Sequence, residues 1–341
     1  MQNKNNLFLK LFQKASLKGR LFYLNSFLGY DIIIISVKSM NKNKSINLSS
    51  ALGGYISSHA PVIEYSDDDI NHFYKNLDVE TLKELYSCGL IKDDKTLFYV
   101  INKFLAESGV LSVADMSYLK KTFDSAKKFN AERFENNPYI KNVRFPTVKN
   151  GNLLITNSCY ERGEIFQYDM PDLSAEVVTL SLGFFDKKVF FPTIYEGDMP
   201  WMSVCPSEIF SMRQPIKNAF GKALVLGLGL GYYPYMISEK QDVSNITIIE
   251  KNPEIIDLFE HYILPSFKNR NKIRILNADA IEYLKSLNAC CFDYCFADLW
   301  ESSVDGAPLY QKIKEQEFRL KQMKFDYWIE NQIKAYLQGD N

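Results

Sequence analysis

The sequence has few histidines, which are common metal ligands. Its three histidines, His59, His72 and His261, are scattered and form no zinc-type spacing with the cysteines. We therefore expect no metal site. The six cysteines are Cys88, Cys159, Cys205, Cys290, Cys291 and Cys295. Three of them lie in or beside a predicted buried strand, which favours reduced thiols and a cytoplasmic protein.

A long apolar run and a dominant charge are also absent. No window reaches the ~20 apolar residues that a membrane-spanning helix requires, and no signal-peptide cleavage pattern is present. The formal net charge is −1, so we expect no nucleic-acid partner. Residues 1–46 hold eight Lys or Arg against one acid. This fits a packed helix with a solvated lysine face, or a segment that binds a membrane surface or an anionic partner.

The most informative stretch runs from Lys222 to Glu250. An apolar run enters a turn that contains Gly227, Gly229 and Gly231, and a helix-compatible segment then leads to a second apolar run that ends at Glu250. This is the order of a βαβ nucleotide-binding unit. Its glycines let the backbone approach a ligand, and a carboxylate about 20 residues on can accept hydrogen bonds from ribose hydroxyls. We therefore expect a nucleotide-like ligand.

Two further strands are predicted to end at acids. One short apolar segment precedes Asp279, and another precedes Asp298. In open α/β sheets the ligand binds beyond the carboxyl ends of the strands. We therefore expect Glu250, Asp279 and Asp298 to converge on one site. Asp298 follows an apolar strand, so its pKa is expected to rise by desolvation, or the group stays a plain anion.

Together these segments resemble the class I S-adenosylmethionine-dependent methyltransferase superfamily, closest in style to the spermidine synthase-like branch. VLGLGLG is similar to the glycine motif, IIEKNPEII to the ribose motif and NADAIEYL to the adenine-side motif. FDYCFADLWESSVDGAPLY is similar to the segment that carries the acceptor-orienting aspartate of aminopropyltransferases. The resemblance covers about Pro206 to Tyr310 and implies S-adenosylmethionine as the cofactor. The cofactor-binding residues that it implies are Gly227, Gly229, Gly231, Glu250, Asp279 and Ala280.

The resemblance also assigns roles to single residues. It implies that Asp298 is the catalytic residue, which orients or deprotonates the acceptor. It implies that Asp279 and Ala280 meet the adenine; Asp279 is equally placed to cap the helix that follows, and both roles are compatible. Trp300 and Glu301 are expected to shape the acceptor pocket, with core packing as the alternative for Trp300.

Two departures from the resemblance bear on the reaction. Gly227 stands where many methyltransferases have an acid that holds the methionine amino group. Leu230 stands where spermidine synthases place an aspartate, and no polyamine-site motif precedes the glycine loop. The sequence therefore favours a methyltransferase that acts on a small molecule or a peptide. The alternatives are a spermidine synthase-like aminopropyltransferase and a non-catalytic adenosyl-binding protein. An NAD enzyme fits less well, since Tyr232 or Pro234 replaces the third glycine of its motif.

The expected fold is α/β with three zones. Residues 1–138 are predicted as a mainly helical domain, residues 139–205 as a small antiparallel β-region, and residues 206–341 as a Rossmann-like S-adenosylmethionine-binding domain. In the first zone, Ser49 to Gly54 is predicted as a loop and Met116 to Phe134 as one long helix. Only 43 residues follow Asp298. The last sheet is therefore expected to be shortened, with the acceptor side completed by the upstream zones or by a second subunit of a homodimer.

Overall fold

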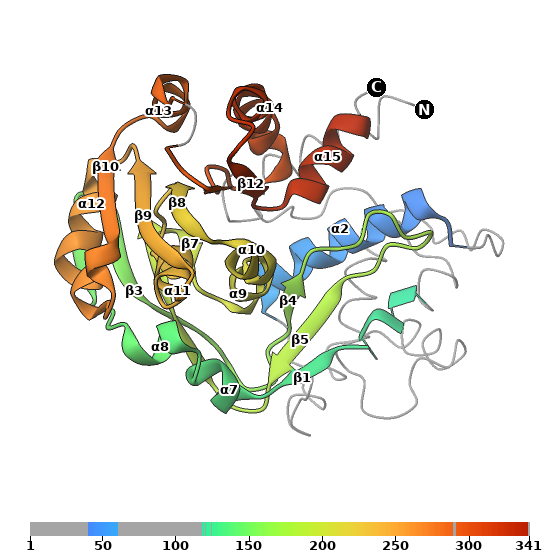
Figure 1. The fold of residues 1–341 in the computed structure, drawn as a ribbon. Coiled ribbons are helices and arrows are strands. Elements are labelled where there is room, and N and C mark those ends of the chain that lie inside the picture. The colour runs from blue at the N-terminus through green and yellow to red at the C-terminus, as the bar shows by residue number, and fades with distance from the viewer. Residues whose placement is uncertain (1–39, 61–117, 120, 124, 289–290, 340–341) are drawn as a thin grey trace, which may run out of the picture. The chain divides into compact units, whose positions relative to one another are not determined.

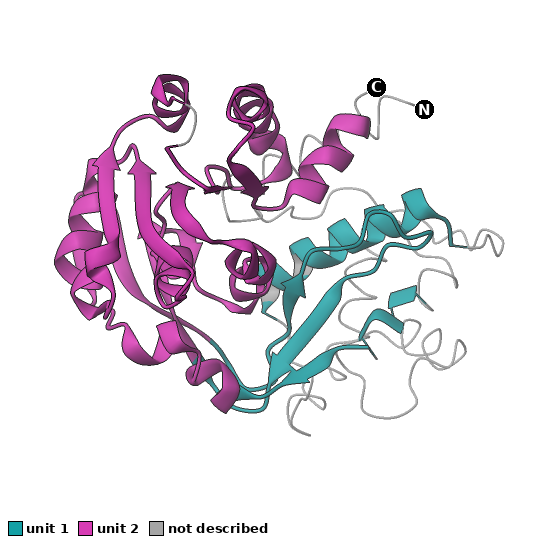
Figure 2. Cartoon of the chain, viewed as in Figure 1, with its two compact units in different colours: residues 1–131, 160–189 teal, residues 132–159, 190–341 magenta. Residues whose placement is uncertain are grey.

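A computed structural model describes residues 40–60, 118–119, 121–123, 125–288 and 291–339 (Figure 1). The chain divides into two compact units, coloured in Figure 2: residues 1–131 with 160–189, and residues 132–159 with 190–341. Most of the basic segment 1–46 and much of the first predicted zone lie outside the described residues. The independent domains expected from the sequence, with limits at 138 and 205, stay a prediction.

Unit 1 contains a helix and a three-stranded sheet. The helix is α2 (Lys42–His59), and the strands are β1 (Lys127–Phe129), β4 (Phe166–Asp169) and β5 (Ser181–Phe185). The strand order is β1-β5-β4, with β1 parallel and β4 antiparallel to β5.

The loop predicted over Ser49–Gly54 is wrong, because these residues lie inside α2. Ser45, Ser49 and Gly53 recur every four positions, so they form a face of small side chains on the helix. This face permits close approach: Ser45 Oγ accepts a hydrogen bond from Val178 N at 2.8 Å, and Ser49 Oγ donates one to Val178 O at 3.1 Å. Packing of this helix face therefore outweighs the local signal of the glycine pair that suggested a loop.

The single helix predicted over Met116–Phe134 is also wrong. Residues 118–119 and 121–123 are helical, but strand β1 follows within the same stretch. The ring of Phe129 lies 5.6 Å from that of Phe166 and 6.0 Å from that of Phe185, between centroids. Pairing with β5 and burial of this ring therefore outweigh the local helical spacing, as tertiary context commonly does.

Unit 2 contains a five-stranded parallel sheet. Its strands are β8 (Gly221–Leu226), β9 (Val243–Glu250), β10 (Ile273–Asn277), β11 (Tyr294–Ala297) and β12 (Lys324–Tyr327). The order is β10-β9-β8-β11-β12, and every neighbouring pair is parallel. This confirms the predicted α/β fold with a Rossmann-like sheet. The sheet is also short, because only α15 (Glu330–Gly339) follows β12 in the described residues.

Both faces of this sheet are covered by other elements (Figure 1). Successive strand residues point to opposite faces. Thus Ala223 and Val225 belong to one core cluster, with residues of α11 (Tyr232–Ser238) and α12 (Pro253–Leu258). Leu224 and Leu226 belong to a second cluster, with residues of α13 (Ala280–Ser286), α14 (Ser303–Arg319) and α15. Between α12 and β10 the chain forms three short turns: η1 (Phe259–Ile263), η2 (Leu264–Ser266) and η3 (Arg270–Lys272).

An antiparallel region precedes the parallel sheet, as predicted. Its strands are β2 (Val148–Asn150), β3 (Leu153–Tyr160), β6 (Val189–Glu196) and β7 (Met199–Ser203), in the order β2-β3-β6-β7. Two short helices come before it, α7 (Ala131–Glu135) and α8 (Pro138–Asn142). Leu153, Ile155 and Ile194 lie in the same core cluster as Val225 and Ile248. The antiparallel sheet therefore shares a core with one face of the parallel sheet.

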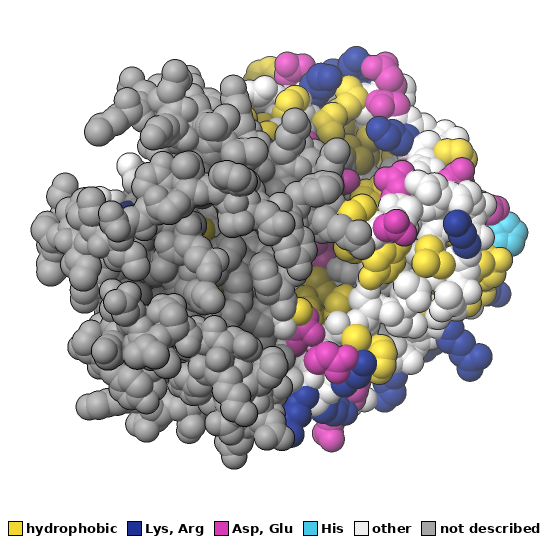
Figure 3. Space-filling view, turned by 180° about the vertical axis from the view of Figure 1, so that it is seen from behind, with side chains coloured by type: hydrophobic (Ala, Val, Ile, Leu, Met, Phe, Trp, Pro, Cys, Tyr) yellow, Lys and Arg dark blue, Asp and Glu magenta, His cyan; other side chains and the backbone are white. Residues whose placement is uncertain are grey.

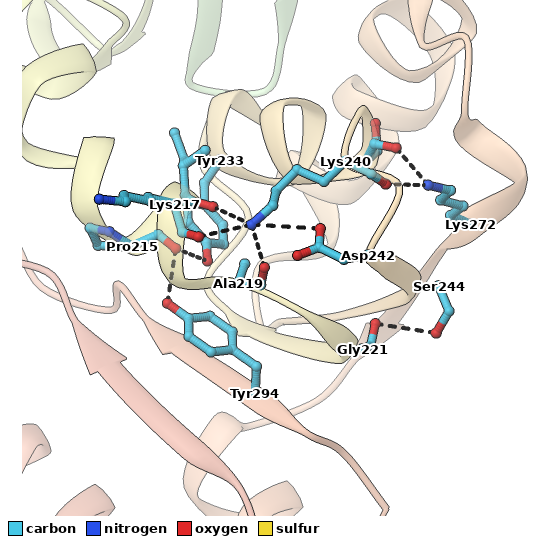
Figure 4. Close-up of polar contacts among 12 residues, drawn as sticks. Pro215, Lys217, Ala219, Gly221, Tyr233, Lys240, Asp242, Ser244, Lys272 and Tyr294 are labelled. Carbon is cyan, nitrogen blue, oxygen red and sulfur yellow. Dashed lines mark hydrogen bonds and ion pairs between the residues drawn. The ribbon is translucent and has the colours of Figure 1, made fainter.

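Two lysine side chains donate hydrogen bonds to the C-terminal ends of two helices in unit 2 (Figure 4). Helices α9 (Pro206–Ser211) and α10 (Arg213–Asn218) connect β7 to β8. Lys240 Nζ donates hydrogen bonds to carbonyl oxygens at the end of α10, those of Ile216, Lys217 and Ala219. Lys272 Nζ does the same for two carbonyl oxygens at the end of α11. The last carbonyls of a helix have no partner within it, so these cations stabilise both ends.

Charged side chains of both signs lie on the described surface. On the face in Figure 3, Lys or Arg side chains and Asp or Glu side chains are interspersed over the described residues. In the same part of the chain no helix has the length and hydropathy needed to cross a membrane.

Candidate functional site

The carboxyl ends of the parallel strands bring the predicted residues to one edge of the sheet. Gly227, which follows β8, donates its N–H to Ile249 O in β9 at 2.9 Å. Asp298, which follows β11, donates its N–H to Leu226 O in β8 at 2.9 Å. The strand order reverses direction between β8 and β11, with β9 on the other side of β8. In open α/β sheets this reversal is where ligands bind.

The glycine loop, residues 227–231, has no space for a Cβ atom at its first residue but has space at its middle residue. Gly227 has φ +95°, and a Cβ atom there would lie 2.1 Å from the carbonyl oxygen of Asp298. No residue with a side chain fits at that position, so the acid that many methyltransferases have there could not be accommodated by this backbone. Gly229 has φ +54°, and a Cβ atom there would meet only Met202 Sδ, at 3.5 Å. Gly231 is the N-cap of α11.

Glu250 connects the glycine loop to the end of β9. Its Oε2 accepts a hydrogen bond from Leu228 N at 3.1 Å, and its Oε1 accepts one from Asn252 N at 2.8 Å. The carboxylate is therefore directed at the loop between Gly227 and Gly229. Each oxygen of a carboxylate has two acceptor positions, so both oxygens keep one for a ligand.

Asp279 lies on the β10 side of the same edge. Its Oδ1 accepts hydrogen bonds from Ile281 N at 2.9 Å and Glu282 N at 3.0 Å, so the carboxylate caps α13. Ala280 is the first residue of that helix and is buried. Strands β9 and β8 separate Asp279 from Asp298 in the sheet order, which corresponds to about 14 Å at the usual strand spacing. The two acids therefore lie at opposite ends of the site.

Asp298 has a companion that the sequence did not indicate, Glu208 in α9. Both side chains are partly buried. Desolvation raises the pKa of Asp298 to about 7. Desolvation, and then the negative charge of Asp298, raise the pKa of Glu208 to about 8. Two carboxyl groups with raised pKa values, one of which acts on the other through its charge, therefore lie at the β11 end of the edge.

Strand β7 contributes a second set of residues that the sequence did not indicate. Trp201 Nε1 donates a hydrogen bond to Glu301 Oε1 at 3.0 Å, which joins β7 to the loop after β11. Met202, the next residue, is the one that approaches Gly229. Trp300 is buried and donates its indole N–H to Trp328 O at 3.2 Å, so core packing describes it better than a pocket wall.

The residues around the end of the glycine loop belong to the core. Leu230 is buried, and its carbonyl oxygen accepts a hydrogen bond from the hydroxyl of Tyr139. Tyr233 is buried and stacks on Phe296 with 4.1 Å between ring centroids. Tyr232 is likewise buried. The tyrosines after the glycines thus face the core rather than the edge.

The signal for Glu208 was present but incomplete. Pro206 marks a helix start, and Glu208 is an acid in the first turn of that helix. Its proximity to Asp298 depends on where α9 packs, which no local pattern encodes. Among the described residues no group of three or more His, Cys, Asp or Glu side chains could hold a metal ion.

Comparison with known proteins finds similarity only in structure. No known family profile matches the chain, and no curated protein matches it. A protein assigned as an O-methyltransferase from Klebsiella pneumoniae is 18% identical, with a TM-score of 0.26 over 33% of this chain and 48% of that one. A spermidine synthase from Thermotoga maritima is 14% identical, with a TM-score of 0.29 over 38% of this chain and 50% of that one.

A third structure is a spermidine synthase in complex with the transition-state analogue AdoDATO. It is 14% identical, with a TM-score of 0.28 over 38% of this chain and 49% of that one. The chain thus matches about half the length of each of these structures. Identities this low concern the fold alone, so the function has to be argued from the site. The chain is thus a distant structural match to a protein assigned as an O-methyltransferase and to two spermidine synthases.

Proposed function

We propose that the chain binds S-adenosylmethionine at the carboxyl edge of the parallel sheet and transfers its methyl group to a small molecule or a peptide. The observation that carries this proposal is the convergence of the glycine loop, Glu250 and Asp298 where the strand order reverses. Such an edge fits an adenosyl ligand whose ribose needs a carboxylate and whose positive charge needs an anion.

The chemistry of the residues present fits this cofactor. Gly229 leaves its backbone open except toward Met202. Glu250 keeps acceptor positions for ribose hydroxyls, and Asp279 and Ala280 are proposed to contact the adenine. Asp298 offers a carboxylate with no hydrogen-bond or ion-pair partner among the described residues. When bound, the cofactor supplies a methyl group on a sulfonium, which is already activated for displacement.

The chain then has to orient the acceptor and accept its proton. The protein supplies alignment for an in-line displacement, and a base when the nucleophile carries a proton. Asp298 is proposed for this role, because a general base works best with a pKa near the working pH, and its pKa is raised to about 7. The bond between Trp201 and Glu301 would hold the acceptor side of the edge in place.

Aminopropyl transfer is less well supported. Leu230 stands at the position where spermidine synthases place an aspartate, and its side chain is buried in the core. No carboxylate is therefore available there for the amine of a decarboxylated cofactor.

Isothermal titration with S-adenosylmethionine, its decarboxylated form and NAD tests the proposal. We expect S-adenosylmethionine to bind, and Glu250→Ala to weaken binding by about 1–3 kcal/mol, the cost of losing a charged hydrogen-bond partner. Glu315→Ala is the matched control, because Glu315 is exposed on α14. Unchanged affinity in a folded Glu250→Ala variant would remove Glu250 from the site. Binding without turnover on any acceptor would favour a non-catalytic adenosyl-binding protein.

A further inference from the structure

Helix α9 is fixed beside the end of β11 by hydrogen bonds. Trp328 Nε1 donates to Ser211 Oγ in the last turn of α9 at 3.0 Å, and Trp328 N donates to Ala297 O at 2.9 Å. Ser211 Oγ also donates to the carbonyl oxygen of Glu208, one turn earlier, at 3.0 Å. Ala297 immediately precedes Asp298. These contacts place Glu208 and Asp298 on neighbouring elements at the same edge.

The described residues neutralise neither of these carboxylates. Within the described residues, no side chain or backbone N–H donates a hydrogen bond to Glu208 or Asp298, and no cation pairs with either. A partly buried carboxylate without a partner is costly, so it tends to hold a proton. The raised pKa values of both groups, about 8 and about 7, agree with this geometry.

The other charged groups on neighbouring elements are engaged elsewhere. Arg213 of α10 lies over the ring of Phe210, 4.3 Å from its centroid. Glu301 binds Trp201, and Asp326 of β12 accepts hydrogen bonds from Asn218 and Tyr294. Glu250 is held by two backbone N–H groups. Among the residues that the structure describes, these charged groups are committed to other partners, so a ligand is the source of charge that we consider for the pair.

We propose that Glu208 and Asp298 form a carboxylate pair whose protonation is set by the charge of the ligand bound beside it. This inference rests on the proposed function. The pair would release a proton to solvent when the positively charged S-adenosylmethionine binds, because a nearby cation favours the ionised form of a carboxyl group. It would keep its proton beside S-adenosylhomocysteine, whose thioether is neutral. The site thus gains a base only while a methyl donor is present.

Proton release can be measured without turnover. Calorimetric titrations at pH 7.5, in two buffers with different heats of ionisation, give the number of protons released as each ligand binds. We expect S-adenosylmethionine to release more protons than S-adenosylhomocysteine, with a smaller excess in Glu208→Gln and in Asp298→Asn. The amino group of each ligand also titrates, but its contribution is common to wild type and variants. For each proton released, the affinity for the ligand rises by up to tenfold with each unit of pH increase.

The variants separate this inference from the function on which it rests. Glu315→Gln is the control, because Glu315 is an exposed acid on α14 with no role in the proposed site; it should leave the proton count unchanged. Both ligands could bind, yet S-adenosylmethionine could release the same excess of protons over S-adenosylhomocysteine in wild type, Glu208→Gln and Asp298→Asn. This result overturns the carboxylate pair and leaves the cofactor assignment intact. Failure of the folded wild-type protein to bind either ligand overturns both.

Discussion

Replacing Asp298 by asparagine should make unit 2 more stable at alkaline pH. Desolvation raises the pKa of Asp298 from its ordinary value of 3.8 to about 7, so the folded state binds this proton more tightly than the unfolded chain. A carboxyl group shifted in this direction contributes stability that is fully present below about pH 4 and is lost as the pH rises through about 7. At about 1.36 kcal/mol for each pKa unit, the loss amounts to about 4 kcal/mol.

The expected result is a difference in pH dependence. The free energy of unfolding of wild-type unit 2 should fall between pH 5 and pH 9. That of Asp298→Asn should fall by about 3 kcal/mol less, because about two of the pKa units between 3.8 and about 7 lie above pH 5. Glu208→Gln should flatten the curve in the same direction, because the pKa of Glu208 is raised as well. Asp298→Asn should also lower the pKa of Glu208, since the charge of Asp298 is one of the causes of its rise.

The tryptophans provide the assay. The chain has three, Trp201, Trp300 and Trp328, and all lie in unit 2, so their fluorescence during urea unfolding reports on this unit. Glu315→Gln, an exposed acid on α14, is the control and should follow the wild type. If Asp298→Asn loses stability with pH as steeply as the wild type, burial does not keep this carboxyl group neutral and the reasoning is refuted.

Three further outcomes are expected. Tyr139→Phe should cost about 1–3 kcal/mol of unfolding free energy in urea, because the buried carbonyl of Leu230 loses its partner; an unchanged midpoint would contradict it. Lys240→Met should cost about 1–3 kcal/mol in the same assay, whereas Lys217→Met, at an exposed position, should be neutral; equal effects would argue against the helix-end contacts. Gly229→Val should abolish S-adenosylmethionine binding in a protein with unchanged circular dichroism, and retained binding would count against the nucleotide site.

The parallel sheet and its edge could be predicted from the sequence because each signal is local. Apolar runs predict the strands, glycines at Gly227 and Gly229 predict the turn, and acids at Glu250 and Asp298 mark strand ends. Parallel strands place their carboxyl ends at one edge of the sheet. A residue predicted at the end of any one strand is therefore also predicted to lie at that edge. The register confirms this, since Glu250 pairs with Asn277 and Ala297 with Leu226.

What the sequence could not provide depends on packing between distant segments. Glu208 is an ordinary acid in a short helix until Ser211 and Trp328 fix that helix beside β11. Gly53 is a helix breaker by propensity, yet it lies inside α2, where a Cβ atom would meet Gln167 Oε1 at 3.7 Å and Leu180 Cδ1 at 3.8 Å. In both cases the decisive partner is more than 100 residues away in the chain.

The antiparallel strands contribute to the site as well as to the core. Strand β7 contributes Met202, the one described side chain that a Cβ atom at Gly229 would meet, and Trp201, which binds Glu301 in the loop that follows Asp298. Helix α8, which comes before these strands, contributes Tyr139, which donates a hydrogen bond to the carbonyl oxygen of Leu230 in the glycine loop. A ligand on the glycine loop would therefore lie between the parallel sheet and β7. Because the cofactor side is formed by the parallel strands, differences in acceptor choice should depend on β7, where Trp201 can be changed without altering any residue proposed to bind the cofactor.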